Sequence, residues 1–265
     1  RQARDGGLVR ELEGWRTILG LCRKYRIDIL LIAGDLFDQP DSPEELARAV
    51  LDLAQDQPEL KIAVSPGNHD TNTIDALWQN WDFPPNWHIF TGDWRPWVLR
   101  ELDTVVWGVA FTAAYQDQSL LGKVDLELLR QARAGSLTGT DGLSGRPLHL
   151  GLMHGNLGNL GSDRINPLTE ADIAASGLDY LALGHHHHGD AEIGQAGATR
   201  YCYCGSAEGH NFYETGPRSC LIGTAFPGDI RLRRVALPGD RYEITDLTLL
   251  QENRDTAVLA AWIEE

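Results

Sequence analysis

The sequence lacks any apolar run that reaches the roughly 18 residues of a membrane-spanning helix. Residues 1–10 also lack the charged start and apolar core of a secretory signal peptide. The 4 cysteines, Cys22, Cys202, Cys204 and Cys220, have neither disulfide-scaffold nor zinc-ribbon spacing. These absences predict a cytoplasmic protein with buried, reduced thiols and no membrane contact. A small metal site at Cys202 and Cys204, on one face of a strand, is the alternative for that pair.

Basic residues are few. The chain has 23 Lys and Arg against 38 Asp and Glu, which gives a formal net charge of −15. Such a chain repels phosphate backbones, so its composition argues against a protein that coats nucleic acid. It does not exclude an enzyme whose bound metal ions supply positive charge locally.

The length and the hydrophobic pattern favour one large α/β domain. Short apolar runs bounded by Gly or Pro predict buried strands, and apolar residues at helical spacing predict helices. The expected strands are 27–33, 61–65, 105–111, 148–153, 180–183, 199–204, 219–225, 230–235 and 242–249. The expected helices are 8–25, 42–55, 120–134, a short one from Thr169 to Gly177, and 253–265.

Polar groups that can bind metal come directly after four of the predicted strands. The residues are Asp35, Asn68-His69-Asp70, His154, and His185 with His187 two positions further on. In open α/β sheets, ligands bind at the carboxyl ends of the strands, so these groups are expected in one crevice. Imidazole, carboxylate and amide groups together suit a divalent transition metal. Taken singly, Asp35 could cap a helix, and Asn68 or Asp70 could be a turn residue.

These motifs resemble, in the same order, those of the calcineurin-like metallophosphoesterases: Gly34-Asp35, Gly67-Asn68-His69-Asp70, His154 and Gly184-His185-x-His187. The resemblance implies a four-layer α/β/β/α sandwich of two mixed sheets. It implies a catalytic domain over residues 1–250 and a terminal helix, or the start of a cap, over 251–265. It also implies two divalent metal ions as cofactors, manganese foremost, with iron or zinc as alternatives.

The resemblance also implies a role for each site residue. Asp35 bridges the two metals, and Asn68, His154 and His185 complete the ligands of the second. His187 joins the first metal. His69 faces the scissile phosphate without binding metal, and Asp70 orients His69. We expect His186 and His188 to point away from the metals, because neighbouring strand residues alternate in direction.

A narrower resemblance is to the SbcD-like DNA-repair exonucleases. It rests on Gly34–Asp38, Asp179–His185 and the segment Gly205–Gly216. It implies a nuclease subunit that acts on DNA ends, as a homodimer and with a coiled-coil ATPase as partner. A phosphatase or phosphodiesterase for nucleotides or other small phosphoesters is the alternative, which the acidic composition favours.

The family's first motif has no counterpart in these residues. The family opens with a strand that ends in Asp-x-His and supplies two ligands of the first metal. Asp5 is not followed by a histidine two residues later, and no strand precedes it. We expect that a stretch before Arg1 carries this strand. A non-catalytic binding module is the interpretation if the strand does not exist.

Overall fold

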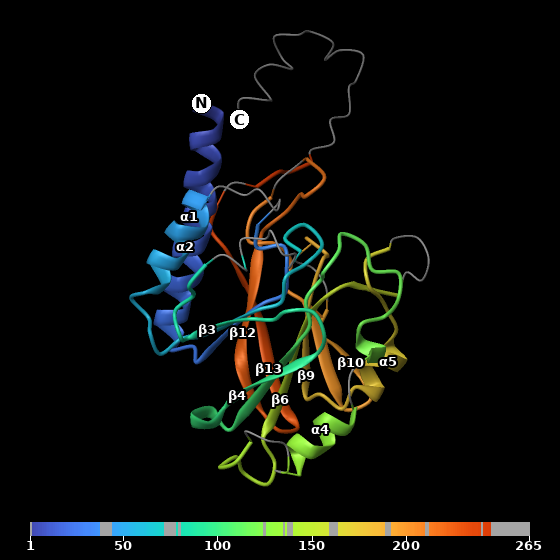
Figure 1. Ribbon diagram of the computed structural model, residues 1–265. Coiled ribbons are helices and arrows are strands. Elements are labelled where there is room, and N and C mark those ends of the chain that lie inside the picture. The colour runs from blue at the N-terminus through green and yellow to red at the C-terminus, as the bar shows by residue number, and fades with distance from the viewer. Residues whose placement is uncertain are drawn as a thin grey trace.

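Two β-sheets pack against each other, and helices cover the outer face of each (Figure 1). The structure is a computed structural model. It describes residues 2–37, 44–71, 78, 81–123, 126–134, 136, 140–158, 164–188, 192–209, 212–239 and 241–244. The predicted helix start at Ser42, together with Asp38 and the expected terminal helix 253–265, lies outside these residues.

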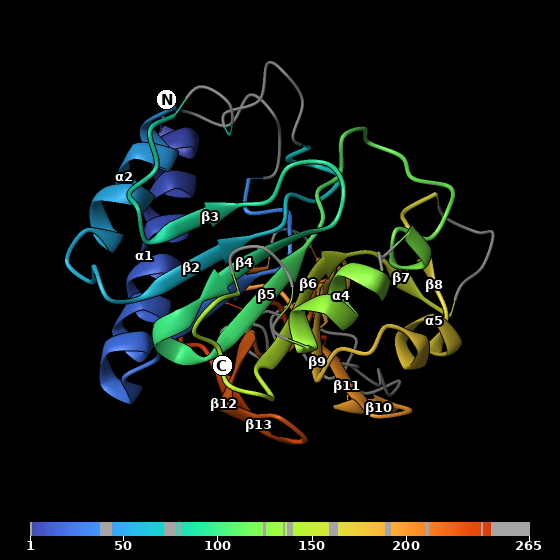
Figure 2. The ribbon, with the colours of Figure 1, turned by 60° about the horizontal axis from the view of Figure 1, so that its bottom comes forward.

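The smaller sheet has three parallel strands in the order β1-β2-β3. Its outer face carries helices α1 and α2, seen beside β2 and β3 in Figure 2. Helix α1 runs antiparallel to β1, because only the turn 26–28 joins them. The bounds are α1 Gln2–Tyr25, β1 Ile29–Ile32, α2 Glu44–Ala54, β2 Lys61–Val64 and β3 Trp87–Ile89.

The larger sheet has six strands in the order β10-β11-β9-β6-β5-β4. Its four inner strands are parallel, while β4 and β10 pair antiparallel at the two edges. Helices α4 and α5 cover its outer face. The bounds are β4 Arg95–Leu99, β5 Thr104–Gly108, α4 Leu126–Arg133, β6 Leu148–His154, α5 Glu170–Ala175, β9 Tyr180–Gly184, β10 Gly194–Ala196 and β11 Thr199–Tyr203.

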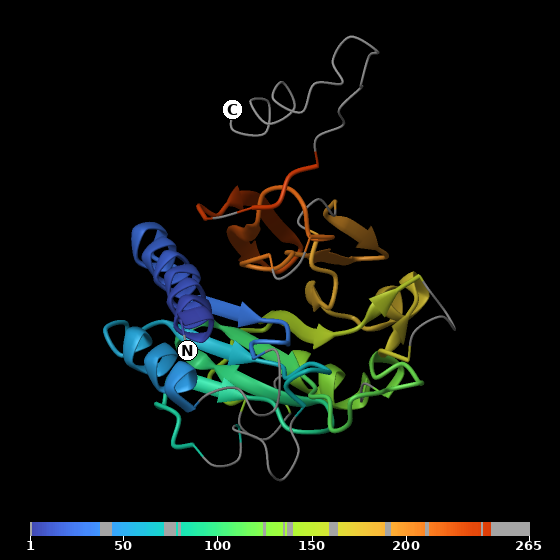
Figure 3. The same ribbon diagram turned by 90° about the horizontal axis from the view of Figure 1, so that it is seen from above.

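The remaining elements are short or stand apart from the two sheets. Strands β12 (Ser219–Phe226) and β13 (Asp229–Ala236) form an antiparallel hairpin of their own. Figure 3 shows this hairpin in orange, on the side of β1 away from β2 and β3. The others are η1 (Arg100–Leu102), η2 (Leu121–Lys123), β7 (Asn156–Leu157) and β8 (Pro167–Leu168).

Strand alternation sorts the core into layers. In β2, Ile62 and Val64 pack toward α1 and α2, while Ala63 faces the other sheet. In β6, Leu150 and Leu152 lie between the sheets, and Met153 packs on the side of α4 and α5. Each fully buried aliphatic side chain contributes roughly 1.5–3 kcal/mol. These buried faces fix the direction of each strand, and so the edge at which its polar end emerges.

Most predicted strands are confirmed, but one helix is wrong. The apolar residues of 120–134 do not form a single helix. Leu121–Lys123 is a 3-10 turn, and the α-helix begins at Leu126. Sequence analysis also missed β3 and β4, and the latter is an edge strand that contains Pro96. Of the strand expected at 242–249, the described residues show only a bridge between Tyr242 and Thr215. No helix within the described ranges combines the length and apolarity that a membrane span requires.

Among the polar side chains buried in this core is a histidine. His149 in β6 is 0% exposed, and its Nδ1 accepts a hydrogen bond of 3.0 Å from Nε1 of Trp107. Burial, reinforced by the charge of Arg133, lowers the pKa of His149 to about 4. The imidazole is therefore neutral in the folded protein at neutral pH.

This histidine predicts a pH-dependent stability. The unfolded chain binds its proton near pH 6.5 and the folded chain only near 4, so its contribution is complete above the first value and lost below it. As the pH falls from 6.5 to about 4, the unfolding free energy of the wild type should decrease by up to about 3 kcal/mol more than that of His149→Leu. Urea denaturation at several pH values measures this, with exposed His188→Leu as control. Equal losses in the wild type and His149→Leu would contradict it.

Candidate metal centre

The polar ends of β1, β2, β6 and β9 meet at one edge of the molecule. In the sheet, His154 at the end of β6 pairs with Gly184 at the end of β9. Across the two sheets, Nδ1 of His154 donates to the carbonyl of Ala33, at 2.9 Å. The strand ends that sequence analysis selected are therefore neighbours.

His154 is the centre of this arrangement and is 1% exposed. Because Nδ1 donates to a carbonyl, the neutral ring has an unprotonated Nε2. That nitrogen lies 3.1 Å from Oδ2 of Asp35 and 2.9 Å from Oδ1 of Asn68. Three atoms that accept hydrogen bonds thus face one point, which suits a cation, either a proton or a metal ion.

The electrostatics of the pair agree with this geometry. Burial alone would lower the pKa of His154, but the contact with Asp35 outweighs it, so the pKa is raised. Burial alone would raise the pKa of Asp35, but His154 and the N–H of His69 outweigh it, so the pKa is lowered. Both shifts favour positive charge beside an ionised Asp35. The donor set, one imidazole, one carboxylate and one amide oxygen, fits a divalent metal.

Asp70 holds the two loops that form this site. Its Oδ1 accepts from the backbone N–H of Asp35 at 3.1 Å and of Gly67 at 2.6 Å, and its Oδ2 from that of Leu36 at 2.8 Å. Burial and the nearby charge of Asp35 raise the pKa of Asp70 to about 6. Asp70 thus fixes the backbone around Asp35, a role that sequence analysis missed. That it also orients His69 stays a prediction.

The histidines expected in the site lie around the same crevice. The ring centroid of His185 is 5.2 Å from that of His154. The backbone N–H of His69 donates to Oδ1 of Asp35 at 2.9 Å, and His69 itself is exposed. His186 instead turns to Asn156, its Nε2 lying 3.0 Å from Oδ1 of that residue. His187 is half-exposed and contacts Glu214.

The predicted ligands are therefore gathered but do not form a complete cage. In the part of the chain that the structure describes, no three His, Cys, Asp or Glu side chains are arranged to hold one metal. The converging set includes the amide of Asn68, and His187 stands apart from Asp35, Asn68 and His154. The roles of all five predicted ligands stay predictions.

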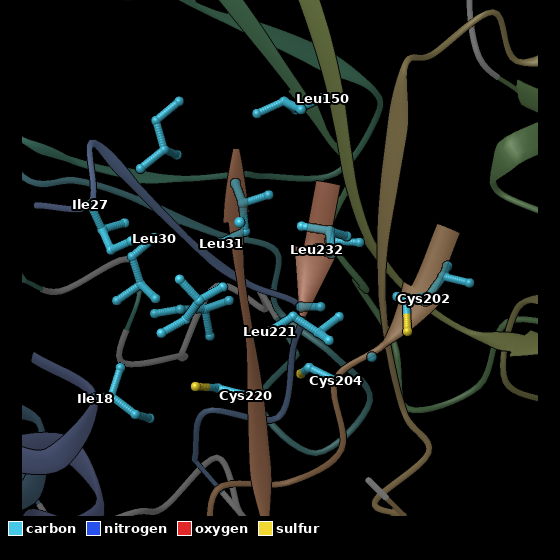
Figure 4. A pocket seen from close by; sticks show the side chains of 18 of the residues that line it. Ile18, Ile27, Leu30, Leu31, Leu150, Cys202, Cys204, Cys220, Leu221 and Leu232 are labelled. Atoms are coloured by element: carbon cyan, nitrogen blue, oxygen red, sulfur yellow. The ribbon is translucent and has the colours of Figure 1, made fainter. Parts of the chain in front are cut away.

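A large apolar cavity opens beside the site. It has a volume of about 1600 Å³ and runs from Asp35, His154 and His187 along the free side of β1. Figure 4 shows Leu30 and Leu31 on one wall and Leu221 and Leu232 of the hairpin on another. This apolar space between a parallel strand and a hairpin is much larger than the small voids of a well-packed protein core. It is large enough to hold a further strand.

The surroundings of the cysteines favour buried, reduced thiols over a second metal site. All four are free thiols and border the cavity, where Figure 4 labels Cys202, Cys204 and Cys220. Burial raises the pKa of Cys204 to about 11 and also raises that of Cys202. Because the thiolate is the form that binds metal, these protonated thiols favour the structural interpretation.

Comparison with known proteins agrees with this geometry. Residues 9–189 match the family described as calcineurin-like phosphoesterase, and the chain belongs to that family. The chain is also similar to the uncharacterized metallophosphoesterase YhaO of Bacillus subtilis (strain 168), with 28% identity over 225 residues. The alignment covers 81% of this chain and 50% of YhaO, so the chain spans about half the length of that relative. Family membership supports a metal-dependent phosphoester hydrolase.

The close approach of the two loops can be tested at Gly67. A Cβ there would collide with Oδ1 of Asp35 and lie 2.8 Å from the backbone nitrogen of the same residue. Gly67→Ala should therefore displace Asp35 and cost about 1–3 kcal/mol of unfolding free energy. Gly145→Ala, where nothing lies within 4 Å, is the control and should change stability by less than about 0.5 kcal/mol. Thermal unfolding of the wild type and both variants measures these changes. A Gly67→Ala variant as stable as Gly145→Ala would contradict the close approach of the two loops.

Proposed function

We propose that this protein is a dinuclear-metal phosphodiesterase of the nuclease type. The observation that carries the proposal is the convergence of Nε2 of His154, Oδ2 of Asp35 and Oδ1 of Asn68 within 3.1 Å. Three acceptors in a crevice at 2.9–3.1 Å are costly to bury unless a cation joins them.

In this proposal, the two ions would share Asp35 as a ligand. Asp35, Asn68, His154 and His185 hold one, and Asp35 and His187 contribute to the other. Bound there, the ions would supply an activated water and neutralise the charge of the phosphoryl oxygens, with manganese as the metal to test first. His69, exposed beside Asp35, donates a proton to the leaving oxygen. Asp70 keeps the loop of His69 rigid through the backbone of Asp35 and Gly67.

We also propose that a β-strand from before Arg1 fills the apolar cavity. Strand β1 is the end strand of its sheet in the described part of the chain. The carbonyls of Asp28 and Ile32 point to β2, so alternation turns the backbone of Ile29 and Leu31 toward the cavity. A parallel strand there would need no new space. Pairing with β1 on one side and the hairpin on the other would unite them into one sheet.

The path of the chain also supports a β-strand in the cavity. Crossovers between parallel strands of one sheet are almost always right-handed and short. Helix α1 leads into β1 and runs opposite to it, so a preceding strand parallel to β1 ends at the edge where Asp35 lies. An Asp-x-His at the end of that strand would face His187 and complete the ligands of the first metal.

Hydrogen exchange tests the strand. In the 265-residue chain, the amides of Ile29 and Leu31 should exchange faster than those of Leu30 and Ile32. Extending the chain with its natural upstream residues should protect Ile29 and Leu31 and raise manganese binding, measured by calorimetry, from one tight site to two. Unchanged exchange at these two amides would contradict the strand. Two equally tight sites in the 265-residue chain would mean that other residues replace the Asp-x-His pair.

The substrate we propose is a DNA end. Support comes from the segment 205–216, which resembles that of the SbcD-like exonucleases and packs directly on His187 through Ser206 and Glu214. The same segment exposes the aromatic rings of Phe212 and Tyr213 to solvent, at 79% and 90%, and exposed rings can stack on unpaired bases. A second copy of the chain and a coiled-coil ATPase are the protein partners that this proposal implies.

The second candidate is a small phosphoester. The net charge of −15 favours it, because a polyanion is repelled more strongly than a small substrate. Hydrolysis of linear DNA against that of a small chromogenic phosphodiester, by the N-terminally extended protein with manganese, separates the two. Activity on the small substrate alone would refute the nuclease proposal.

His69 is the test of the reaction itself. His69→Ala should lower turnover by about 10²–10⁴-fold, because a positioned acid is lost, while metal content stays near that of the wild type. Elemental analysis and turnover of the extended protein measure both quantities. His188→Ala, at an exposed neighbour of the same motif, is the control and should keep its activity. Loss of metal from the His69 variant would make His69 a ligand instead.

A further inference from the structure

The proposed metal ligand His187 is held by a buried carboxylate. Its Nδ1 lies 2.9 Å from Oε1 of Glu214, and the side chain of Glu214 is only 7% exposed while that of His187 is 42% exposed. A carboxylate only accepts hydrogen bonds, so Nδ1 of the ring carries the proton. In the neutral imidazole, Nε2 is then the unprotonated nitrogen.

Arg218 holds both partners of this contact. Its side chain is 4% exposed, and Nη1 lies 3.7 Å from Oε2 of Glu214. The same Nη1 donates to the backbone carbonyl of His187 at 3.2 Å, and Nη2 donates to the carbonyls of Glu214 at 2.6 Å and Thr215 at 2.8 Å. The guanidinium thus ties the chain around Glu214 to the chain around His187.

Ser206 closes the arrangement from the other side. Its backbone N–H donates to the carbonyl of His187 at 3.1 Å, and its hydroxyl donates to the same carbonyl at 3.3 Å. His187 is therefore fixed at its main chain by Ser206 and Arg218 and at its ring by Glu214. The buried charge of Glu214 already has Arg218 as its counter-ion, so charge balance does not require the half-exposed His187.

We infer that Glu214 is a positioning residue for metal binding by His187. It selects the ring tautomer that leaves Nε2 unprotonated, and its negative charge makes that nitrogen a better donor. Arg218 holds Glu214 in place. The inference rests on the proposed function, because it assumes that His187 binds one of the ions.

The tautomer can be measured without metal. In long-range proton–nitrogen NMR spectra at alkaline pH, where imidazole is neutral, His187 of the wild type should have a protonated Nδ1. Glu214→Ala should shift the population toward the Nε2-protonated form that free histidine prefers. Glu214→Gln, whose amide oxygen still accepts, should keep more of the Nδ1-protonated form. An unchanged tautomer in Glu214→Ala would overturn the inference.

Manganese binding to the N-terminally extended protein is the second measurement. Glu214→Ala should weaken one metal by about 10–100-fold, the usual effect of losing a partner that orients a ligand. His187→Ala should weaken the same metal, and the double variant should bind no worse than His187→Ala alone. The exposed Glu192 provides the matched control, and Glu192→Ala should bind as the wild type does.

The outcomes separate this inference from the proposed function. A wild type that binds no manganese refutes both. A wild type that binds two ions, with Glu214→Ala unaffected, refutes only the role of Glu214. Additive losses in the double variant would show that Glu214 acts on the fold rather than through His187. If Glu214→Ala does not fold, Glu214→Gln is compared with the wild type. Because the neutral amide removes the charge that strengthens the donor nitrogen, manganese binding that is unchanged in Glu214→Gln overturns the inference.

Discussion

The structure depends on the contact between the two sheets at His154. One ring nitrogen donates to Ala33 at the end of β1, and the other faces Asp35 and Asn68 from the loops after β1 and β2. Burying an imidazole, a carboxylate and an amide without compensation would cost several kcal/mol. A cation shared by the three groups, as proposed above, would offset that cost. Glycines at positions 67 and 184 leave the space that this close approach of the chain needs.

Around this contact, the side chain of Asp70 holds the neighbouring loops through their backbone N–H groups. Asp70 uses both carboxylate oxygens to hold backbone N–H groups on either side of Asp35. Burial, and then the negative charge of Asp35, raises the pKa of Asp70 to about 6, so repulsion between the two carboxylates contributes to the shift. A cation bound at Asp35 would relieve that repulsion. In the proposed function, the loops after β1 and β2 would therefore be most stable with metal bound, which would couple metal binding to loop order.

The sequence predicted the strands that end at the site because each is a short apolar run followed by a polar group. It did not predict β3 or β4, whose residues mix Trp, His, Arg and Pro and have no clear period. The candidate ligands were predictable from type and order. The contacts of Asp70 with the backbone of Asp35 and of Glu214 with His187 were not, because they join residues 35 and 27 positions apart. Only tertiary structure brings such residues together.

The two halves of the site differ in how they are built. The half around His154 lies where both sheets close, and its side chains are buried and held by hydrogen bonds. The half around His187 lies on the free side of β1, beside the apolar cavity. In the described residues, β1 is an edge strand of its sheet and borders this cavity, so its outward backbone N–H and C=O groups have no strand partner there. In the described part of the chain, His187 and the open edge of β1 both border this cavity, so the proposed strand in the cavity would cover both.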